Sequence, residues 1–398
     1  DVDGDAIDDA LVVASQSGGS TAQLVFGAQG GNSPVRLALN IPANIHQGFY
    51  GLGGVGLGDI NGDSINDYAV IGVQAGFAGS AIALYFGCIG CDNAELAAPD
   101  ALIFANGNRL FSVVASAGNF NQRAGDNGAI NDIFLGGTIS AQANPTTAFV
   151  VAGRQNWPLL PNVLTVDEDP AAGGEGITVL GVPDGKAGYA GAGVGDLNGD
   201  GFGDLLFSAG TPSVVYRFNG GADLGDEIDY EVANPNTTIV AHTCSADPDG
   251  YGEHIMGGLD LDGDAQGRPN YAISDGINRR VIVFDETDQS IDCFGRSRSL
   301  FGNVVDFAGD IDGDGFTDLV VSHSGEQFDA FVFYNDGMGR FGDGAAEAPR
   351  EAHIILDQPA LPKIGVAGLG DMNGDGRDDL GALVKQPGAG NLELVIYY

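Results

Sequence analysis

Acidic residues crowd into one short segment of the chain, which reads GVGDLNGDGFGDLLFSAG. Asp196, Asn198 and Asp200 stand two residues apart, and Asp204 follows eight residues after the first. Carboxylates this close repel one another unless a cation lies among them or water surrounds them. A tight loop with side-chain oxygens at positions 1, 3, 5 and 9, and the backbone carbonyl of Phe202 at position 7, surrounds a hard cation with oxygens. Because no His or Cys takes part, the pattern predicts Ca²⁺ rather than zinc or copper.

The segment is a repeat, because related copies begin at residues 1, 59, 119, 196, 260, 310 and 371. We number these copies as the first to the seventh acidic loop. In the five regular loops the predicted Ca²⁺ ligands are Asp1, Asp3, Asp5, Ile7 and Asp9; Asp59, Asn61, Asp63, Ile65 and Asp67; Asp196, Asn198, Asp200, Phe202 and Asp204; Asp310, Asp312, Asp314, Phe316 and Asp318; and Asp371, Asn373, Asp375, Arg377 and Asp379. Up to seven Ca²⁺ ions are therefore expected.

Two loops are altered by insertions. The fifth offers Asp260, Asp262, Asp264, Arg268 and Asn270, and the third offers Asn119, Asn121, Asp126 and Asp132. By carboxylate count the first and sixth loops should bind Ca²⁺ most tightly and the third most weakly. An EF-hand is excluded because position 12 falls inside an apolar segment instead of presenting a bidentate Glu. The alternative is a solvated acidic turn that binds no metal. It would explain a single copy of the segment more readily than seven periodic copies.

The spacing of the loops predicts the elements that position them. Steps of 50 to 77 residues fit about four short strands with their turns. Apolar segments at 10–15, 21–27 and 35–41 follow the first loop, and a Gly-rich segment follows at 48–58. The 66 glycines argue against long helices but suit strands that converge on a narrow axis. We predict an all-β fold: one seven-bladed β-propeller over residues 1–398, with four-stranded antiparallel blades.

Composition excludes several classes of partner. The 54 acidic and 16 basic residues give a net charge of −38, which disfavours nucleic acid and anionic membrane surfaces. The 43% hydrophobic content nevertheless predicts a folded chain. No apolar stretch of 18 residues exists, so no membrane insertion is expected. No signal peptide is visible at Asp1, so an exported protein would be in its mature form.

The four cysteines form an even set that suits an oxidising compartment. Two disulfides are expected, and the pairing assumed here is Cys88 with Cys91 and Cys244 with Cys293. A zinc site at Cys88 and Cys91 is the alternative, but it needs a second pair of ligands close in space.

An aromatic residue followed by Gly precedes three of the acidic loops by nine residues, at Tyr50-Gly51, Tyr251-Gly252 and Phe301-Gly302. At the same position, nine residues before the loop, the fourth and seventh copies have Ala187-Gly188 and Pro362-Lys363 instead. An aromatic-Gly pair followed by an acidic loop resembles the FG-GAP repeats of integrin α-subunit β-propellers and of many secreted bacterial proteins. This resemblance implies seven blades, Ca²⁺ in the hairpin between the first two strands of each blade, and ligand binding through loops on the opposite face or between blades.

The resemblance also implies a function, although no inserted ligand-binding domain of the integrin type is present. We expect a secreted or cell-surface, Ca²⁺-stabilised module for adhesion or scaffolding, without catalysis, that binds a protein or glycan. A polysaccharide lyase is an alternative, but the basic residues cluster only at Arg279-Arg280 and 296–298 and the five histidines are dispersed. A lectin is another, for which the single Trp157 would be the candidate sugar platform, with a buried loop anchor as its competing role.

The ends of the chain raise a question of closure. It opens at the first acidic loop, without a preceding inner strand, and closes with NLELVIYY, which suits a third strand without a fourth. The pattern gives 26 strands where a closed ring would need 28. Either the sequence is shortened, or a neighbouring protomer supplies strands at this seam and builds a head-to-tail filament.

Overall fold

The computed structural model describes residues 1–16, 19–28, 34–40, 45, 53–74, 79–105, 111–121, 130–138, 147–160, 162–166, 177–181, 187–209, 214–222, 224, 227–229, 237–241, 244, 251–295, 301–323, 330–341, 352, 354–356, 363–385 and 392–398. Within these residues the fold is all-β apart from α1 (Asn93–Leu96), a single turn capped by Asp92. The all-β prediction is therefore confirmed.

The described strands form seven sheets, which we number in chain order. The first three, with strands given from the inner edge outward, are β1 (Ala10–Gln16), β2 (Gly19–Phe26) and β3 (Val35–Ala38); β4 (Gly53–Gly58), β5 (Asp67–Val73), β6 (Ser80–Tyr85), β7 (Ala101–Ala105) and β11 (Leu164–Val166); and β8 (Phe111–Gly118), β9 (Asp132–Thr138), β10 (Thr147–Val151), β12 (Ile177–Gly181) and β16 (Glu227–Asp229).

The other four sheets follow the same order. They are β13 (Ala187–Gly195), β14 (Asp204–Ala209), β15 (Val214–Phe218) and β17 (Thr237–Val240); β18 (Tyr251–Leu259), β19 (Asn270–Asp275), β20 (Arg280–Phe284) and β21 (Ser290–Gly295); β22 (Phe301–Gly309), β23 (Asp318–His323), β24 (Ala330–Phe333) and β25 (Ile354–Leu356); and β26 (Lys363–Gly370), β27 (Asp379–Lys385) and β28 (Leu392–Tyr397).

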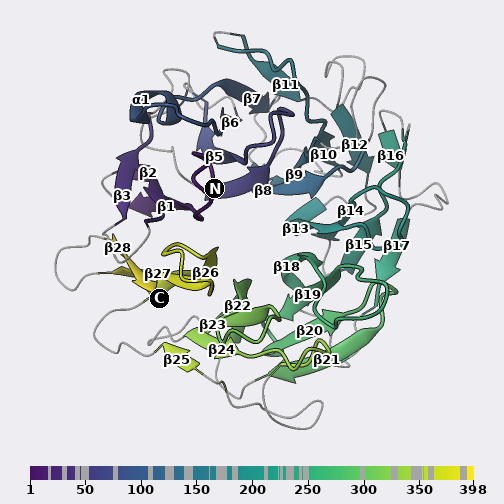
Figure 1. Ribbon diagram of the computed structural model, residues 1–398. Helices are drawn as coiled ribbons and strands as arrows, with labels where there is room; N and C mark the ends of the chain where they lie inside the picture. Colours follow the sequence, from purple (N-terminus) through teal and green to yellow (C-terminus); the bar gives the residue numbers. More distant parts are fainter. Residues whose placement is uncertain are drawn as a thin grey trace.

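The sheets stand around a common centre, and the sheet that begins the chain lies beside the sheet that ends it (Figure 1). Apolar clusters lie between neighbouring sheets, so strands in the middle of the sheets, such as β5, β14 and β19, are buried on both faces. The cluster between the second and third sheets, for example, joins Leu57 and Ile71 to Phe111 and Leu135. At the seam between the seventh and first sheets the fully buried set of the described residues is small: Ala10, Val25 and Met372.

Glycine on the inner strands has a steric reason. A Cβ at Gly193 of β13 would collide with the backbone oxygen of Ser116 on β8. A Cβ at Gly368 of β26 would likewise collide with the backbone oxygen of Phe307 on β22. Neighbouring inner strands therefore approach so closely that side chains do not fit between them, which is the role expected for a Gly-rich strand near the axis.

The aromatic-Gly pairs have distinct structural tasks. Tyr251 and Phe301 are buried at the start of β18 and β22. Gly252 and Gly302 follow with φ of 85° and 86°, and the pairing register shifts directly after them. The aromatic ring fills the core while the glycine allows a bulge that other residues resist. Tyr50-Gly51 and Pro362 lie outside the described residues.

Two sheets depart from the prediction of four antiparallel strands. The short strand β11 adds to β7 in parallel, and β16 adds to β12 in parallel. Each of these two strands comes from the repeat that follows its sheet, β11 from the third and β16 from the fourth. These two repeats have the longest steps to the next acidic loop. That extra length lets the chain return and cover the outer edge of the preceding sheet, which protects an otherwise unpaired edge.

The first and seventh sheets have three described strands each. In the first, no described strand pairs with the inner edge of β1. In the seventh, no described strand pairs with the outer edge of β28. The disulfides in the structure are Cys88–Cys91 and Cys244–Cys293, as assumed from the sequence.

One inner strand carries a charge at the centre of the ring. Asp306 of β22 accepts the N–H of Phe307 at 3.0 Å and that of Gly368 on the neighbouring β26. Burial raises the pKa of its carboxyl from 3.8 to about 7. The equivalent positions of the other described inner strands hold Val55, Ala115, Ala192, Met256 and Ala367.

We expect Asp306→Asn to make the protein more stable at high pH. Between pH 3.8 and about 7 the folded protein binds one more proton at Asp306 than the unfolded chain does, so the free energy of unfolding falls as pH rises through that window. The rise of the pKa from 3.8 to about 7 corresponds to about 4 kcal/mol, so the variant should gain up to about 4 kcal/mol over the native protein at pH 8 and little at pH 4. Urea denaturation at both pH values, with Ca²⁺ present, measures this. A gain that does not change with pH would contradict it.

Candidate metal centres

The first residue of each regular acidic loop organises the loop around its carboxylate. In the fourth loop, Oδ1 of Asp196 accepts the N–H of Gly199 at 2.7 Å and of Asp200 at 3.0 Å, and Oδ2 accepts that of Gly201 at 2.7 Å. The carboxylates of Asp310 and Asp371 make the same three bonds in their own loops. The backbone therefore wraps around position 1 with its amides pointing inward.

Positions 3 and 5 continue this pattern. Oδ1 of Asn198 accepts the N–H of Asp200 at 2.8 Å, and Oδ1 of Asp200 accepts the N–H of Phe202 at 3.0 Å. The turn needs a left-handed backbone at positions 4 and 6. Position 4 is Gly in all five regular loops, whereas position 6 holds Ala6 (φ 67°) and Ser64 (φ 71°) in the first two. The loop conformation is thus kept even where glycine is absent.

Position 9 has a second, structural role. Asp204 is fully buried, and its two oxygens accept the N–H of Leu197 within the loop at 3.0 Å and of Gly220 after the third strand at 2.9 Å. The same pair of bonds recurs at Asp9, Asp67, Asp132 and Asp318. Each closing carboxylate ties its loop to the segment that follows the second strand after the loop, as Asp204 ties the fourth loop to Gly220 after β15.

Burial acts on the charge of these closing carboxylates. It raises the pKa of Asp67 and Asp318 to about 7 and of Asp204 and Asp379 to about 6. It also raises the pKa of Asp9. Further carboxylates of the same loops add to the rise through repulsion. A divalent cation beside such a group favours its charged form, so binding of a cation at these loops would release protons.

The geometry of two loops fits a cation directly. Carboxylate oxygens of Asp1, Asp3 and Asp9 lie within 4.8 Å of one another, and so do those of Asp310, Asp312 and Asp314. Two oxygens on one Ca²⁺, each about 2.4 Å from the ion, can be no further apart than about 4.8 Å. These are the two loops with four carboxylates. The second, fourth and seventh loops have Asn at position 3, so an amide oxygen must take the place of one carboxylate.

The fifth loop fits a cation less well. Its closing residue Asn270 uses Oδ1 to accept the N–H of Leu261 at 2.6 Å and of Asp262 at 3.2 Å, and its buried Nδ2 has no hydrogen-bond partner among the described residues. Asp264 accepts the N–H of Gln266, two residues further on as in the regular loops, and also the N–H of Gly267. In the third loop Asn119, Asn121 and Asp132 are described, whereas Asp126 lies outside the described residues.

The loops are hydrogen-bonded to one another all round the ring. Each sheet donates to a backbone oxygen in the loop of the preceding sheet, in seven links: Cys88 N to Val2 O (2.9 Å), Asn131 N to Asp59 O (2.7 Å), Gly203 N to Asn119 O (2.8 Å), Arg268 Nη1 to Leu197 O (3.4 Å), Asn335 Nδ2 to Leu261 O (2.8 Å), Asp378 N to Asp310 O (3.3 Å) and Asp8 N to Asp371 O (3.3 Å). We call this set the loop ring. The last link joins the two ends of the chain.

Two further carboxylates act in the loop ring, and neither is among the ligands predicted from the sequence. Oδ2 of Asp8 accepts the N–H of Asp371 at 2.9 Å, and Oδ2 of Asp378 accepts the N–H of Asp310 at 2.7 Å. Both stand at position 8, directly before the closing residue. In the sequence both are marked by a second Asp directly before the closing residue, at 8–9 and 378–379, whereas the predicted ligands occupy odd positions only.

The residues that the lectin and lyase hypotheses depend on do not belong to the acidic loops. Trp157 is 5% exposed, and its indole N–H donates to the backbone oxygen of Ile60 at 3.0 Å. The hypothesis of an exposed sugar platform at Trp157 is therefore wrong, because the ring is a buried anchor between two sheets. Arg280 donates to the backbone oxygen of Cys244, and burial lowers the pKa of His254. Residues 296–298 lie outside the described residues.

A ring of mostly antiparallel sheets, linked by a repeated acidic loop, defines a β-propeller-like protein. Residues 310–382, which hold the sixth and seventh loops, match the family model described as FG-GAP-like repeat, so the resemblance to FG-GAP repeats is confirmed. No curated protein sequence matches the chain significantly.

Solved structures are similar in fold. The BP39L lectin from Burkholderia pseudomallei has a TM-score of 0.53 at 12% identity, covering 98% of this chain and 92% of the lectin. BBS1N, solved in complex with ARL6DN, has a TM-score of 0.49 at 12% identity, with the same coverage. At this identity the likeness to the lectin concerns the fold alone. No described helix has the length and apolar character needed to cross a membrane.

Proposed function

We propose that the chain is a seven-bladed, Ca²⁺-stabilised FG-GAP propeller that acts outside the cell as a non-catalytic adhesion or scaffold module. The observation that carries the proposal is the loop ring, in which oxygen-rich loops of one design recur from sheet to sheet. Carboxylates of Asp1, Asp3 and Asp9, and of Asp310, Asp312 and Asp314, would hold the ions most directly. Bound Ca²⁺ would neutralise the crowded carboxylates and fix the loops.

Two further observations support an extracellular site of action. All four cysteines are paired in disulfides, which persist in oxidising compartments. Loops of this kind are exposed and lack a bidentate Glu, so they suit the weak affinities that only millimolar extracellular Ca²⁺ saturates. The net charge of −38 would fall in magnitude on binding but would stay strongly negative, which favours solubility and disfavours anionic partners.

Calorimetric titration tests the metal part of the proposal. Protein stripped with EDTA and dialysed should take up several equivalents of Ca²⁺ with dissociation constants of about 10⁻⁵ to 10⁻³ M and release protons near pH 7, because the closing carboxylates have raised pKa values. Asp3→Asn together with Asp312→Asn should remove the tightest equivalents. Exposed Asp92→Asn, outside the loops, serves as the matched control. Uptake of less than one equivalent by the native protein would contradict the proposal.

The non-catalytic part needs its own test. The protein with Ca²⁺ is incubated with acidic polysaccharides while absorbance near 235 nm reports unsaturated products, and an immobilised sample is screened against glycans and extracellular proteins. We expect binding that EDTA abolishes, and no product. Formation of unsaturated sugar would overturn the non-catalytic assignment in favour of a lyase.

A further inference from the structure

Position 8 of an acidic loop lies where two loops meet. In the seventh loop this residue is Asp378, and its Oδ2 accepts the N–H of Asp310, the first residue of the sixth loop, at 2.7 Å. In return, the N–H of Asp378 donates to the backbone oxygen of Asp310 at 3.3 Å. Asp8 of the first loop makes the same two bonds to Asp371, the first residue of the seventh loop, at 2.9 and 3.3 Å. These two carboxylates therefore belong to one loop and hold the leading residue of another.

The residue that precedes the sixth and the seventh loop leaves room for this contact. Gly309 and Gly370 have φ of 80° and 68°, a conformation that favours glycine. A Cβ at Gly309 would collide with the carboxylate of Asp378, and a Cβ at Gly370 would collide with that of Asp8. Both partners of each contact are therefore shaped for it.

The other five loops have no carboxylate at position 8. Asn66, Asn131, Gly203, Pro269 and Thr317 occupy it in the second to the sixth loop. The sixth, seventh and first loops thus form a run of three that is joined by two carboxylates, and the remaining junctions lack this device.

The residues beside Asp378 face two loops at once. Asp379 is buried and closes the seventh loop. The guanidinium of Arg377 lies beside the sixth loop, where a Cβ at Gly313 would be 3.2 Å from its Cζ. The backbone oxygen of Arg377 and the carboxylate of Asp379 are predicted ligands of the seventh loop. When these two ligands are held in place, Asp378 between them is held as well, and with it Asp310.

We propose that Asp378 and Asp8 are positioning residues that couple Ca²⁺ binding between neighbouring loops, so that the sixth, seventh and first loops fill as one cooperative unit. This inference rests on the Ca²⁺ binding proposed above. With the seventh loop filled, Asp378 presents Asp310 in the conformation that the sixth loop requires, so less ordering remains to be done when the sixth loop fills. Repulsion between two bound ions acts in the opposite direction, so the sign of the coupling distinguishes the two effects.

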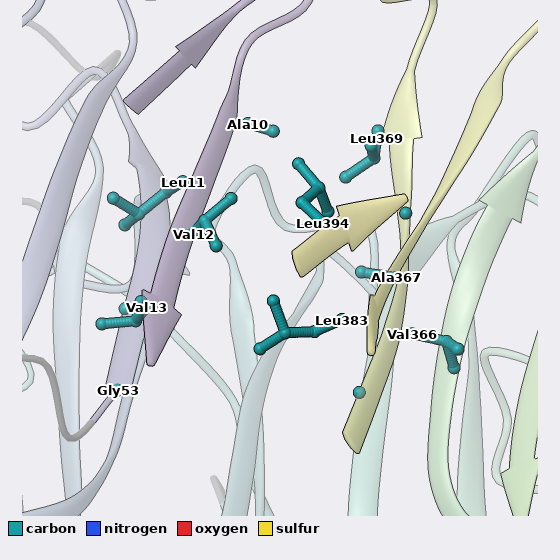
Figure 2. A pocket seen from close by; sticks show the side chains of 13 residues that line it. Ala10, Leu11, Val12, Val13, Gly53, Val366, Ala367, Leu369, Leu383 and Leu394 are labelled. Atoms are coloured by element: carbon teal, nitrogen blue, oxygen red, sulfur yellow. The ribbon is translucent and has the colours of Figure 1, made fainter. Parts of the chain in front are cut away.

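The sixth and seventh loops are the better pair for a test. The seventh and first sheets meet around an apolar groove of about 290 Å³, with Val12 on one side and Leu394 on the other (Figure 2). Between the sixth and seventh sheets, by contrast, Val320, Val332 and Leu380 belong to one buried cluster. These two sheets are therefore held together independently of Asp378, and its substitution tests the contact between the loops.

Hydrogen exchange followed by mass spectrometry reads each loop separately in the intact protein. Backbone amides of the sixth loop donate to Asp310, and those of the seventh loop donate to Asp371. Peptides that contain these amides should become protected as each loop takes up Ca²⁺. The free Ca²⁺ concentration at half-protection then gives a midpoint for each loop.

Asp375→Asn weakens the exposed position 5 of the seventh loop but keeps an oxygen for the N–H of Arg377. We expect it to raise the midpoint of the sixth loop at least about fivefold, and Asp314→Asn should raise the midpoint of the seventh loop by the same factor, because coupling is reciprocal. In protein that carries Asp378→Ala, Asp375→Asn should leave the midpoint of the sixth loop unchanged. Asp378→Asn keeps an acceptor for the N–H of Asp310 and should retain the coupling.

The first and second loops are the matched control pair, because position 8 of the second loop is Asn66. Asp63→Asn in the second loop should leave the midpoint of the first loop unchanged. A midpoint of the sixth loop that Asp375→Asn lowers or leaves unchanged, or raises equally with and without Asp378→Ala, would overturn the coupling while Ca²⁺ binding stands. Exchange that does not respond to Ca²⁺ in any loop would overturn the proposed function as well.

Discussion

Removal of Ca²⁺ with EDTA is expected to lower the melting temperature by about 10 °C or more. A site at one hundred times its dissociation constant stabilises the folded state by about 2.7 kcal/mol, so the first and sixth loops alone would contribute about 5 kcal/mol in millimolar Ca²⁺. A chain of this size shifts by about 2 °C for each kcal/mol. Without the ions, the carboxylates that lie within 4.8 Å of one another at Asp1, Asp3 and Asp9 repel. Differential scanning calorimetry measures the shift.

Specificity for the ion is the control for this experiment. Restoring Ca²⁺ after EDTA should recover the original melting temperature, whereas equimolar Mg²⁺ should recover little of it, because Mg²⁺ demands a tighter octahedral shell. A melting temperature that EDTA leaves unchanged would show that the loops hold their shape through the amide hydrogen bonds alone, and the assignment of structural Ca²⁺ would fail.

Substitution of a closing carboxylate should be the most damaging single change in a loop. Asp204→Ala leaves the buried N–H groups of Leu197 and Gly220 without their acceptor, at a cost of about 1 to 3 kcal/mol for each. The loop would also lose its tie to the third strand of the fourth sheet. We expect a loss of about 2 to 5 kcal/mol in the free energy of unfolding, with or without Ca²⁺, measured by urea denaturation.

Asp200→Asn is the matched comparison for that variant. Asp200 belongs to the same loop but is exposed, and Asn keeps an oxygen that can accept the N–H of Phe202. Its substitution should reduce stability only when Ca²⁺ is present. If the two variants lose the same stability in EDTA, the closing carboxylate has no structural role beyond that of an exposed ligand.

The repeated loops and the strands beside them were predictable from the sequence because both depend on local spacing. The apolar segment at 10–15 corresponds to β1 (Ala10–Gln16), and 35–41 contains β3 (Val35–Ala38). Turn residues end these segments in the sequence as they do in the structure. Gly-rich inner strands were expected on steric grounds, and Gly193 and Gly368 show the reason at atomic distance.

What the sequence did not indicate depends on contacts between distant segments. The parallel pairing of β11 with β7 joins residues some sixty positions apart and leaves no periodic pattern in three residues. Trp157 is an anchor because it reaches Ile60 in the preceding loop, a partner that composition does not reveal. Asp8 and Asp378 bond across sheets, so their role becomes visible only when neighbouring loops stand side by side.

The small core at the seam has a mechanical consequence. Ala10, Val25 and Met372 are the fully buried described residues of the cluster between the sheets at the chain ends, while the other junctions are packed with aromatic and branched side chains. Among the described residues the ring therefore has its smallest core at this junction, where hydrogen bonds between Asp8 and Asp371, and from the N–H of Ala28 to the backbone oxygen of Met372, join the two sheets. Amide hydrogens of β1 and β28 should exchange with solvent first, and a stretched molecule should open at this junction before any other.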